Sequence, residues 1–186
     1  MTTAVATRLN LGRSLAREAG IAVGLAGLTA VAAKVAVPLP WTPVPATLQT
    51  AVVIFAGAAC GPWRGAAAML LYLAAGLAGA PVFAPWTGAG PAVLLAPSAG
   101  YLVAFPLAAW LAGRGGGRRV RWLWSLAGLA AVYALGAAWL GIWALAMAAP
   151  IGAAWVLLAG VLPFLPFDLA KGALAVWSAG PLRRRL

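Results

Sequence analysis

The chain has 186 residues, of which 65% are hydrophobic and 8% are charged, and its formal net charge is +11. A soluble domain of this length could not bury so much apolar surface, so the composition excludes a soluble fold and predicts an integral membrane protein. There is no histidine and one cysteine, Cys60, which excludes an internal disulfide and a Cys/His metal site.

The N-terminal segment, residues 1–17, is polar and contains three arginines, and an apolar run extends from Gly20 to Val37. A positively charged start followed by an apolar run is also the order of a signal peptide. No clear cleavage site precedes the proline-rich stretch that comes next, so we expect a retained first membrane span at residues 18–37.

Six membrane-spanning helices fit the chain, which predicts an all-α bundle. The expected spans are residues 18–37, 47–60, 64–79, 98–113, 122–144 and 167–179. Several are shorter than the ~20 residues that cross ~30 Å of hydrocarbon. We therefore expect short helices in a compact bundle at residues 18–182, within a single domain that covers residues 1–186. Residues 151–162 are apolar, and the sequence leaves open a surface helix or part of a longer hairpin.

The positive charges divide unequally between the two sides of this bundle. Eleven arginines fall on one side: Arg8, Arg13, Arg17, Arg64, Arg114, Arg118, Arg119, Arg121, Arg183, Arg184 and Arg185. The segments on the other side, 38–46, 80–97 and 145–151, contain no charged residue. The positive-inside rule then places both termini, including the basic tail at residues 183–186, in the cytoplasm. Topology and contact with anionic membrane lipid explain the arginines, so nucleic acid is not an expected partner.

Two of the outer segments are rich in proline, glycine and tryptophan. Residues 37–49 contain four prolines, which favour an extended, semi-rigid conformation because proline fixes φ and lacks an N–H donor. Residues 81–91 have a similar composition. Trp41 and Trp86 lie in these segments, where they either belong to an interfacial aromatic belt or cover a ligand.

Charged side chains within the apolar segments are the first candidates for function. Asp168 and Lys171 are three residues apart in the sixth expected span, so a helix places them on one face within mutual reach. Ionised groups inside a bilayer are costly and rarely persist without a partner or a function. The pair either binds a ligand on the outer side, about 22 Å from Arg183 along a helix, or locks this span to its neighbours. We expect Lys34, near the outer end of the first span, to extend toward the interface.

Five more polar residues are expected at the same outer level: Thr47, Gln49, Tyr72, Ser98 and Tyr101. Each has an ordinary structural role, as a helix cap or as part of the aromatic belt, and together they would form a pocket with apolar walls. No nucleotide-binding loop and no nucleophile–base set accompany them. We therefore expect solute binding and transport rather than catalysis, with no cofactor.

Small residues follow one stripe of the first span. Ala22, Ala26 and Ala30 recur at four-residue intervals, with Gly20 before them and Gly24 and Gly27 between them. Such a stripe lets another helix approach closely. The approaching helix belongs either to the same bundle or to a second protein.

Five stretches, taken in order, resemble the BioY family, the substrate-binding (S) components of biotin ECF transporters. They are residues 37–50, 61–65, 71–83, 96–101 and 162–171. The resemblance implies a six-helix S component in the bacterial inner membrane that takes up biotin with high affinity, with its site near the outer face. The implied partners are a transmembrane T subunit and two ATPases, and the resemblance leaves open a homo-oligomer when the chain is alone.

The resemblance also implies roles for particular residues. Asp168 would accept hydrogen bonds from the ureido N–H groups of biotin, and Lys171 would donate to the ureido carbonyl. Gln49 matches the family's glutamine in the second span, and the Ala22, Ala26 and Ala30 stripe matches the surface that docks on the T subunit. The other expected biotin-contacting residues are Thr47, Trp41, Tyr72, Phe83, Trp86, Ser98 and Tyr101.

The chain departs from the family pattern near the expected position of the vitamin's carboxylate. Residues 96–101 read Ala-Pro-Ser-Ala-Gly-Tyr in place of Gly-Pro-Thr-Gly-Gly-Tyr, and Phe167 replaces a glycine. The loop between the third and fourth expected spans, residues 80–97, is called the third loop. Its residues 84–93 lack an asparagine or arginine, so Thr87, Ser98 or backbone amides are the expected substitutes. The alternative functions are an S component for another vitamin and a membrane assembly protein that uses the charge pair only for packing.

Overall fold

The structure, a computed structural model, describes the backbone of residues 2–147 and 152–183 and, from residue 14 onward, their side chains. This part of the chain is mostly helical, as the composition predicts. Its α-helices are α1 (Thr2–Lys34), α2 (Gln49–Cys60), α3 (Pro62–Leu77), α4 (Ala99–Gly113), α5 (Arg118–Ala146), α6 (Ala153–Gly160) and α7 (Leu165–Leu182). The other elements are a 3-10 helix, η1 (Pro91–Leu95), and two short strands, β1 (Ala36–Val37) and β2 (Ala46–Thr47).

The helices differ in their capacity to cross a membrane. Within the described residues, Ser14–Lys34 and Arg118–Ala146 are long and apolar enough to span it. The pair α6 and α7 would form a third span, although it bends by 46° at the break between the two helices. Helices α2 and α4 are apolar but shorter, which agrees with the expectation of short helices. The count of six spans stays a prediction.

Two helices extend further than the sequence predicts. Helix α1 begins at Thr2, so the segment expected to precede the first span continues it as helix. Helix α5 begins at Arg118 and therefore includes Arg119 and Arg121, which were expected in a loop. Charge misled the prediction here, because arginine is a good helix former and its charge does not end a helix. The arginines at 184 and 185 and residues 148–151 lie outside the described part.

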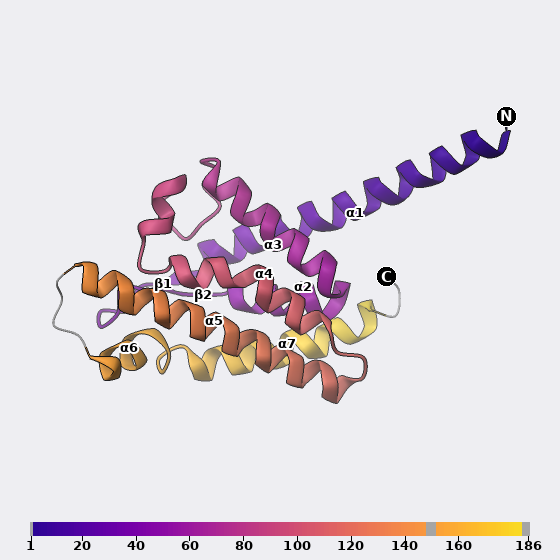
Figure 1. The fold of residues 1–186 in the computed structure, drawn as a ribbon. Coiled ribbons are helices and arrows are strands. Elements are labelled where there is room, and N and C mark those ends of the chain that lie inside the picture. Colours follow the sequence, from indigo (N-terminus) through magenta and orange to yellow (C-terminus); the bar gives the residue numbers. More distant parts are fainter. Residues whose placement is uncertain (1, 148–151, 184–186) are drawn as a thin grey trace.

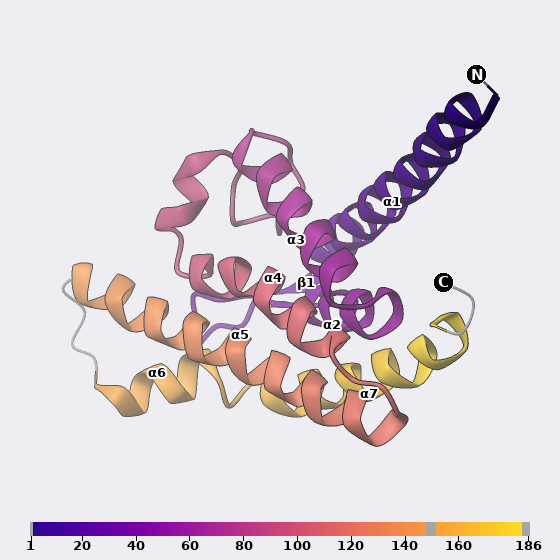
Figure 2. The same cartoon turned by 45° about the vertical axis from the view of Figure 1, so that its right-hand side comes forward.

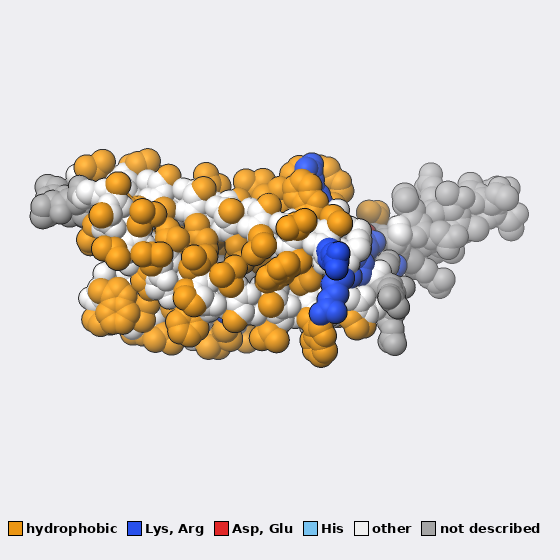
Figure 3. All heavy atoms as spheres, turned by 90° about the horizontal axis from the view of Figure 1, so that it is seen from below, with side chains coloured by type: hydrophobic (Ala, Val, Ile, Leu, Met, Phe, Trp, Pro, Cys, Tyr) orange, Lys and Arg blue, Asp and Glu red, His pale blue; other side chains and the backbone are white. Residues whose placement is uncertain are grey.

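Helices α4, α5 and α7 run roughly alongside one another, whereas α1 lies obliquely to them and projects beyond the other helices at its N-terminal end (Figures 1 and 2). The two termini lie toward the same end of the molecule, and α6 lies at the opposite end. Figure 3 shows one long face of the molecule, which is covered by hydrophobic side chains except for a group of Lys and Arg side chains at one end. This arrangement is the one expected of helices surrounded by lipid.

Helix α2 lies in the middle of the bundle. None of its residues is exposed, and it packs against α1, α3, α4 and α7. Glycine makes this close packing possible, because a Cβ at Gly57 would overlap the backbone carbonyl of Ala109 in α4. A Cβ at Gly65 of α3 would likewise overlap the backbone of Gly57.

The alanine stripe of α1 packs inside the bundle. Ala26 is buried, and Ala22 and Ala30 are partly buried against the same core. The helix turns Ala26 toward α2 and α3, which agrees with packing inside the bundle, one of the two alternatives for this stripe. Docking of a partner on the stripe stays a prediction. The glycines Gly20, Gly24 and Gly27 are not packed, since a Cβ at any of them would meet nothing within 4 Å.

The first proline-rich loop is not helical, as predicted, but it is extended only at its two ends, which pair as a narrow β-ribbon, and it turns between them at residues 40–44. Strands β1 and β2 are antiparallel, with Ala36 opposite Thr47 and Val37 opposite Ala46. The amide of Leu48 donates to the carbonyl of Val35, with 3.3 Å between the nitrogen and oxygen atoms. The ribbon thereby ends where α2 begins and positions Thr47 and Gln49 beside the interior of the bundle.

Candidate functional site

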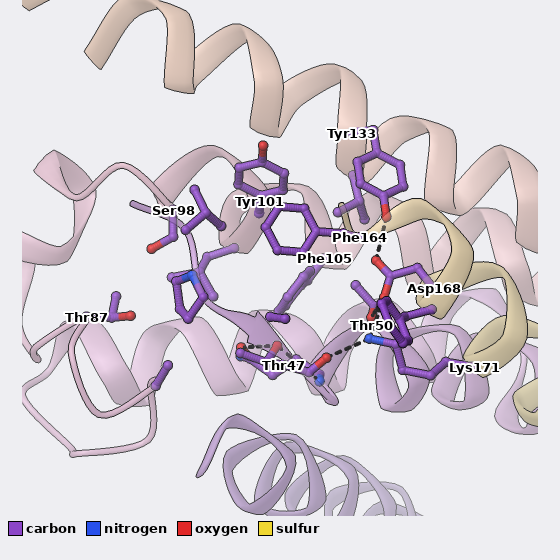
Figure 4. Close-up of a pocket in the computed structure, with 18 residues that line it drawn as sticks. Thr47, Thr50, Thr87, Ser98, Tyr101, Phe105, Tyr133, Phe164, Asp168 and Lys171 are labelled. Carbon is purple, nitrogen blue, oxygen red and sulfur yellow. Dashed lines mark hydrogen bonds and ion pairs between the residues drawn. The ribbon is translucent and has the colours of Figure 1, made fainter. Parts of the chain in front are cut away.

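A pocket lies between the β-ribbon, the third loop and four helices (Figure 4). Eighteen residues line it. They come from residues 44–50 around the β-ribbon, from Ala84, Thr87 and Ser98 of the third loop, and from α4, α5 and residues 164–171 around the start of α7. Half of these side chains are aliphatic, proline or phenylalanine, and several of the polar ones converge around Asp168. Apolar walls with a few convergent polar groups are typical of a small-molecule site.

Asp168 is the central polar group of this pocket. It lies in the first turn of α7, where the helix dipole favours a negative charge, and it is only 5% exposed. Its Oδ1 accepts a hydrogen bond of 2.8 Å from the Thr50 hydroxyl of α2. Its Oδ2 accepts one of 2.7 Å from the Tyr133 hydroxyl of α5. Three helices therefore meet at one carboxylate.

Lys171 completes this polar group. Its ammonium forms an ion pair with Asp168, one helical turn away on α7. The same Nζ donates to the backbone carbonyl of Thr47 at 2.7 Å. Removing two charges from water is costly, and the cost is offset only where hydrogen bonds complete the pair. Here Thr50, Tyr133 and the Thr47 carbonyl supply those bonds.

A second polar chain runs from the pocket wall into the bundle. The Thr47 hydroxyl and the Gln49 Oε1 are 3.0 Å apart, and the Gln49 Nε2 donates to the Tyr72 hydroxyl at 2.7 Å. The Tyr72 hydroxyl in turn donates to the carbonyl of Val82 at 3.2 Å. Gln49 is buried and Tyr72 is almost fully so, and this chain satisfies both side chains. It also connects the start of α2 to the third loop.

The apolar walls of the pocket are held in place by close packing. Tyr101 of α4 donates from its hydroxyl to the carbonyl of Gly160 at 2.8 Å, and its ring lies against Gly136 of α5, where a Cβ would overlap it. Phe105 of α4 and Phe164, just before α7, line the pocket beside it and are both buried. Close packing leaves these rings little freedom to move.

The third loop is fixed to the bundle by Lys34. The Lys34 Nζ donates to the carbonyls of Pro81 and Phe83, each at 2.7 Å. Lys34 is exposed at the end of α1, where these two loop carbonyls lie within its reach, and its extension toward the interface stays a prediction. The Phe83 ring packs against Gly76, where a Cβ would overlap it. Ala84, the next residue of the loop, lines the pocket.

The pocket brings together six of the ten residues that the sequence predicts to contact a ligand. These are Asp168, Lys171, Gln49, Thr47, Ser98 and Tyr101. The other four, Tyr72, Phe83, Trp41 and Trp86, do not line it. Tyr72 and Phe83 are buried behind the wall, whereas Trp41 is 59% and Trp86 is 63% exposed.

Two polar residues of the site were missed. Thr50 follows Gln49 directly and would have been found by extending the polar start of α2 by one residue. Tyr133 lies in the middle of the long apolar helix α5. A tyrosine far from both ends of a span does not fit an interfacial belt, and this was the signal that could have identified it.

Comparison with known proteins places these features in a family. The model of the BioY family matches residues 2–186. The chain is 41% identical over 161 residues to the "Probable biotin transporter BioY" of Pyrococcus horikoshii, covering 87% of this chain and 93% of that protein. It is 34% identical to the "Biotin transporter BioY" of Thermotoga maritima, covering 84% of this chain and 90% of that one.

The fold is similar to that of a solved structure described as the S-component for biotin from an ECF-type ABC transporter. The TM-score is 0.81, the sequence identity is 24%, and the match covers 92% of this chain and 93% of the other. At this identity the likeness establishes the fold. It supports a multi-pass membrane protein, in agreement with the apolar surface in Figure 3.

Proposed function

This chain belongs to the BioY family, and we propose that it binds biotin in the pocket around Asp168 and Lys171 and serves its transport across the membrane. The observation that carries the proposal is the buried carboxylate of Asp168, which accepts hydrogen bonds from two hydroxyls and an ammonium at the edge of a largely apolar pocket. The names of the relatives identify biotin as the solute.

The chemistry of biotin suits these groups. Its ureido ring carries two N–H donors and a carbonyl acceptor on a compact apolar bicycle. In the proposed complex, Asp168 accepts from a ureido N–H, and Lys171 turns from the Thr47 carbonyl to donate to the ureido oxygen. The hydroxyls of Thr50 and Tyr133 remain as donors to Asp168. Phe105 and Phe164 would enclose the thioether ring, since both line the pocket.

The valerate carboxylate of biotin needs a different partner. Lys171 is the one cation among the residues that line the pocket, and it is already paired with Asp168. Figure 4 places Thr87 and Ser98 on the side of the pocket away from this pair. We propose that these two hydroxyls bind the carboxylate, so that the vitamin lies across the pocket with its ureido ring at α7.

The proposed transport component has six spans and cytoplasmic termini and works with partners. A transmembrane T subunit and two ATPases would supply the energy from ATP hydrolysis, since the chain has no nucleotide-binding loop. The positions of the termini, at the same end of the bundle as the cationic side chains, support the cytoplasmic orientation. The proposal treats residues 1–186 as one membrane domain and has no catalytic step.

Binding of labelled biotin to the purified full chain in detergent tests the proposal. We expect saturable binding at nanomolar concentration, and an analogue without ureido N–H groups should compete about 10⁴-fold less well, because it leaves Asp168 unpaired. Absence of saturable binding up to micromolar biotin would overturn the proposal. Tighter binding of a different vitamin would assign the same pocket to that solute.

The second candidate function is a structural one, in which the pair of Asp168 and Lys171 only holds the helices together. One observation favours it. The pair connects α7 to α2 through the Thr50 hydroxyl, to α5 through the Tyr133 hydroxyl and to the β-ribbon through the Thr47 carbonyl. On this alternative, replacing Asp168 lowers the melting temperature of the protein and biotin has no effect on it. Biotin should instead raise the melting temperature if the pocket binds it, by mass action on the folded state.

A further inference from the structure

The basic end of the bundle contains a groove between the start of α5 and the end of α7. Two adjoining hollows that share Arg118, Val176 and Trp177 form it, and we call it the α5–α7 groove. Its other lining residues are Arg119, Arg121, Trp122, Ala173, Ser178, Gly180 and Pro181. One wall is therefore cationic, and the other is built from tryptophan and aliphatic side chains.

The cations of this groove have no anionic side chain as a partner among the residues that the structure describes. The sequence has two acidic residues, and the described ion pairs commit Glu18 to Arg64 and Asp168 to Lys171. No aspartate or glutamate is left to neutralise Arg118, Arg119 or Arg121. The Nε of Arg121 is buried and has no hydrogen-bond partner in the described structure. A buried donor without a partner is costly, and an external acceptor would satisfy it.

The position of these arginines in the helix makes their uncompensated positive charge still less favourable. They lie in the first turn of α5, at the positive end of the helix dipole, where cations are disfavoured. This turn contains no acidic residue, and no side chain caps it. Arg183 brings a fourth guanidinium nearby, because it donates to the carbonyls of Gly115, in the loop before α5, and of Gly113, the last residue of α4. A bound anion would therefore offset both the repulsion among these guanidinium groups and their unfavourable position at the positive end of the helix dipole.

The surroundings identify the anion as part of a lipid. The groove lies where the apolar surface of the bundle meets its cationic end (Figure 3). Large apolar side chains on both helices are exposed beside it, including Leu123 of α5 at 64% and Leu174 and Trp177 of α7 at 67% and 69%. We propose that the α5–α7 groove binds the phosphate of an anionic phospholipid, whose acyl chains lie along this exposed surface of α5 and α7. Basic pockets between membrane helices are known to suit such headgroups.

Native mass spectrometry of the purified, delipidated full chain tests this site. The probes are phosphatidylglycerol and phosphatidylcholine with the same acyl chains, which differ in net headgroup charge. We expect one phosphatidylglycerol to bind about 30-fold more tightly, since two arginines near a phosphate each contribute about fivefold. The Arg118→Gln/Arg121→Gln variant should bind both lipids alike. If that variant does not fold, Arg118→Gln alone should lower the preference about fivefold.

Arg114→Gln is the matched control. Arg114 lies at the same end of the bundle but outside the groove, with its guanidinium carbon 3.5 Å from the centre of the Trp110 ring. This variant loses the same charge and should keep the preference for phosphatidylglycerol. An equal loss in Arg114→Gln would reduce the effect to net charge and overturn the proposal, as would a wild-type protein without preference.

Two further measurements distinguish a lipid site from a site for free anions and from the proposed biotin site. Millimolar inorganic phosphate should not displace the lipid, and displacement would show that the groove is a free-anion site instead. Biotin binding should be unchanged in all three variants, because the groove lies toward the opposite end of α7 from Asp168. The lipid site and the proposed biotin site can therefore fail independently.

Discussion

The two acidic residues of this chain form two ion pairs in very different surroundings. Glu18 of α1 and Arg64 of α3 pair through two hydrogen bonds of 2.5 and 2.6 Å, and their side chains are 42% and 31% exposed. The side chains of Asp168 and Lys171 are 6% and 17% exposed. The two side chains of the exposed pair bond directly to each other. The buried pair forms additional hydrogen bonds with Thr50, Tyr133 and the Thr47 carbonyl. The polar groups around an ion pair, more than the pair itself, therefore distinguish a site from a surface contact.

Replacing the buried acid should have the largest effect. We expect Asp168→Asn to weaken biotin binding about 100-fold or more, because the acceptor for the ureido donors becomes a neutral amide and Lys171 loses its counter-charge. Titration with labelled biotin measures this change. The matched variant Glu18→Gln removes the other acid and should leave the affinity unchanged. An equal loss of affinity in both variants would show that the buried and the exposed ion pair affect biotin binding alike, which would contradict the distinction drawn between them.

Replacing the buried cation should mainly cost stability. Lys171→Met keeps an apolar chain of similar length but leaves Asp168 without its cation, which we expect to lower the free energy of unfolding by about 3 kcal/mol. Denaturation in mild detergent measures the loss. The double variant Asp168→Asn/Lys171→Met should regain most of this stability without regaining biotin binding. If the double variant binds biotin with normal affinity, Asp168 and Lys171 do not contribute to biotin binding.

Lys34 offers an intermediate case, since it bonds to two carbonyls instead of a carboxylate. We expect Lys34→Met to release the third loop and to speed the dissociation of biotin about tenfold, because two charge-assisted hydrogen bonds are lost. Stopped-flow displacement with excess unlabelled biotin measures the rate. Lys34→Arg retains donors and should dissociate at nearly the wild-type rate. A change confined to the association rate would argue against a role in holding the loop.

The exposed pair should give the smallest effect. Arg64→Gln should leave biotin affinity unchanged and cause at most a small drop in melting temperature, because exposed ion pairs are screened by solvent and salt. The drop should shrink further at high salt. A large loss of stability that persists at high salt would show that the pair between α1 and α3 matters more than its exposure indicates.

Much of this site could be predicted from residue type and spacing. An acid and a base three residues apart in an apolar helix must share a face, and Asp168 and Lys171 do so. The rotation of the long apolar helices could not be predicted in the same way. When both faces of a helix are apolar, the sequence does not determine which side turns inward. For this reason the sequence left open whether the alanines of α1 face the bundle or a partner. Tyr133 of α5 was missed although its distance from both ends of the helix was a signal.

The contacts of the third loop are another feature that the sequence could not predict. Its proline and glycine content predicts an irregular backbone, and residues 78–90 indeed form no helix or strand. The partners of its carbonyls depend on which helix ends lie nearby, and that follows only from the assembled bundle. Three consecutive carbonyls of this loop accept hydrogen bonds from distant side chains. Lys34 donates to those of Pro81 and Phe83, 47 and 49 positions away, and Tyr72 donates to that of Val82, 10 positions away. No local pattern contains this information.

The central position of α2 has a consequence for the choice of host membrane. A helix enclosed on every side by protein is not matched to bilayer thickness, so its twelve residues need not span the hydrocarbon. Hydrophobic mismatch acts on the perimeter helices, which respond to a thicker or thinner bilayer by tilting. Thr47, Gln49 and Thr50, where α2 meets the ribbon, are thereby insulated from lipid composition. Solute affinity should vary little between thin and thick bilayers.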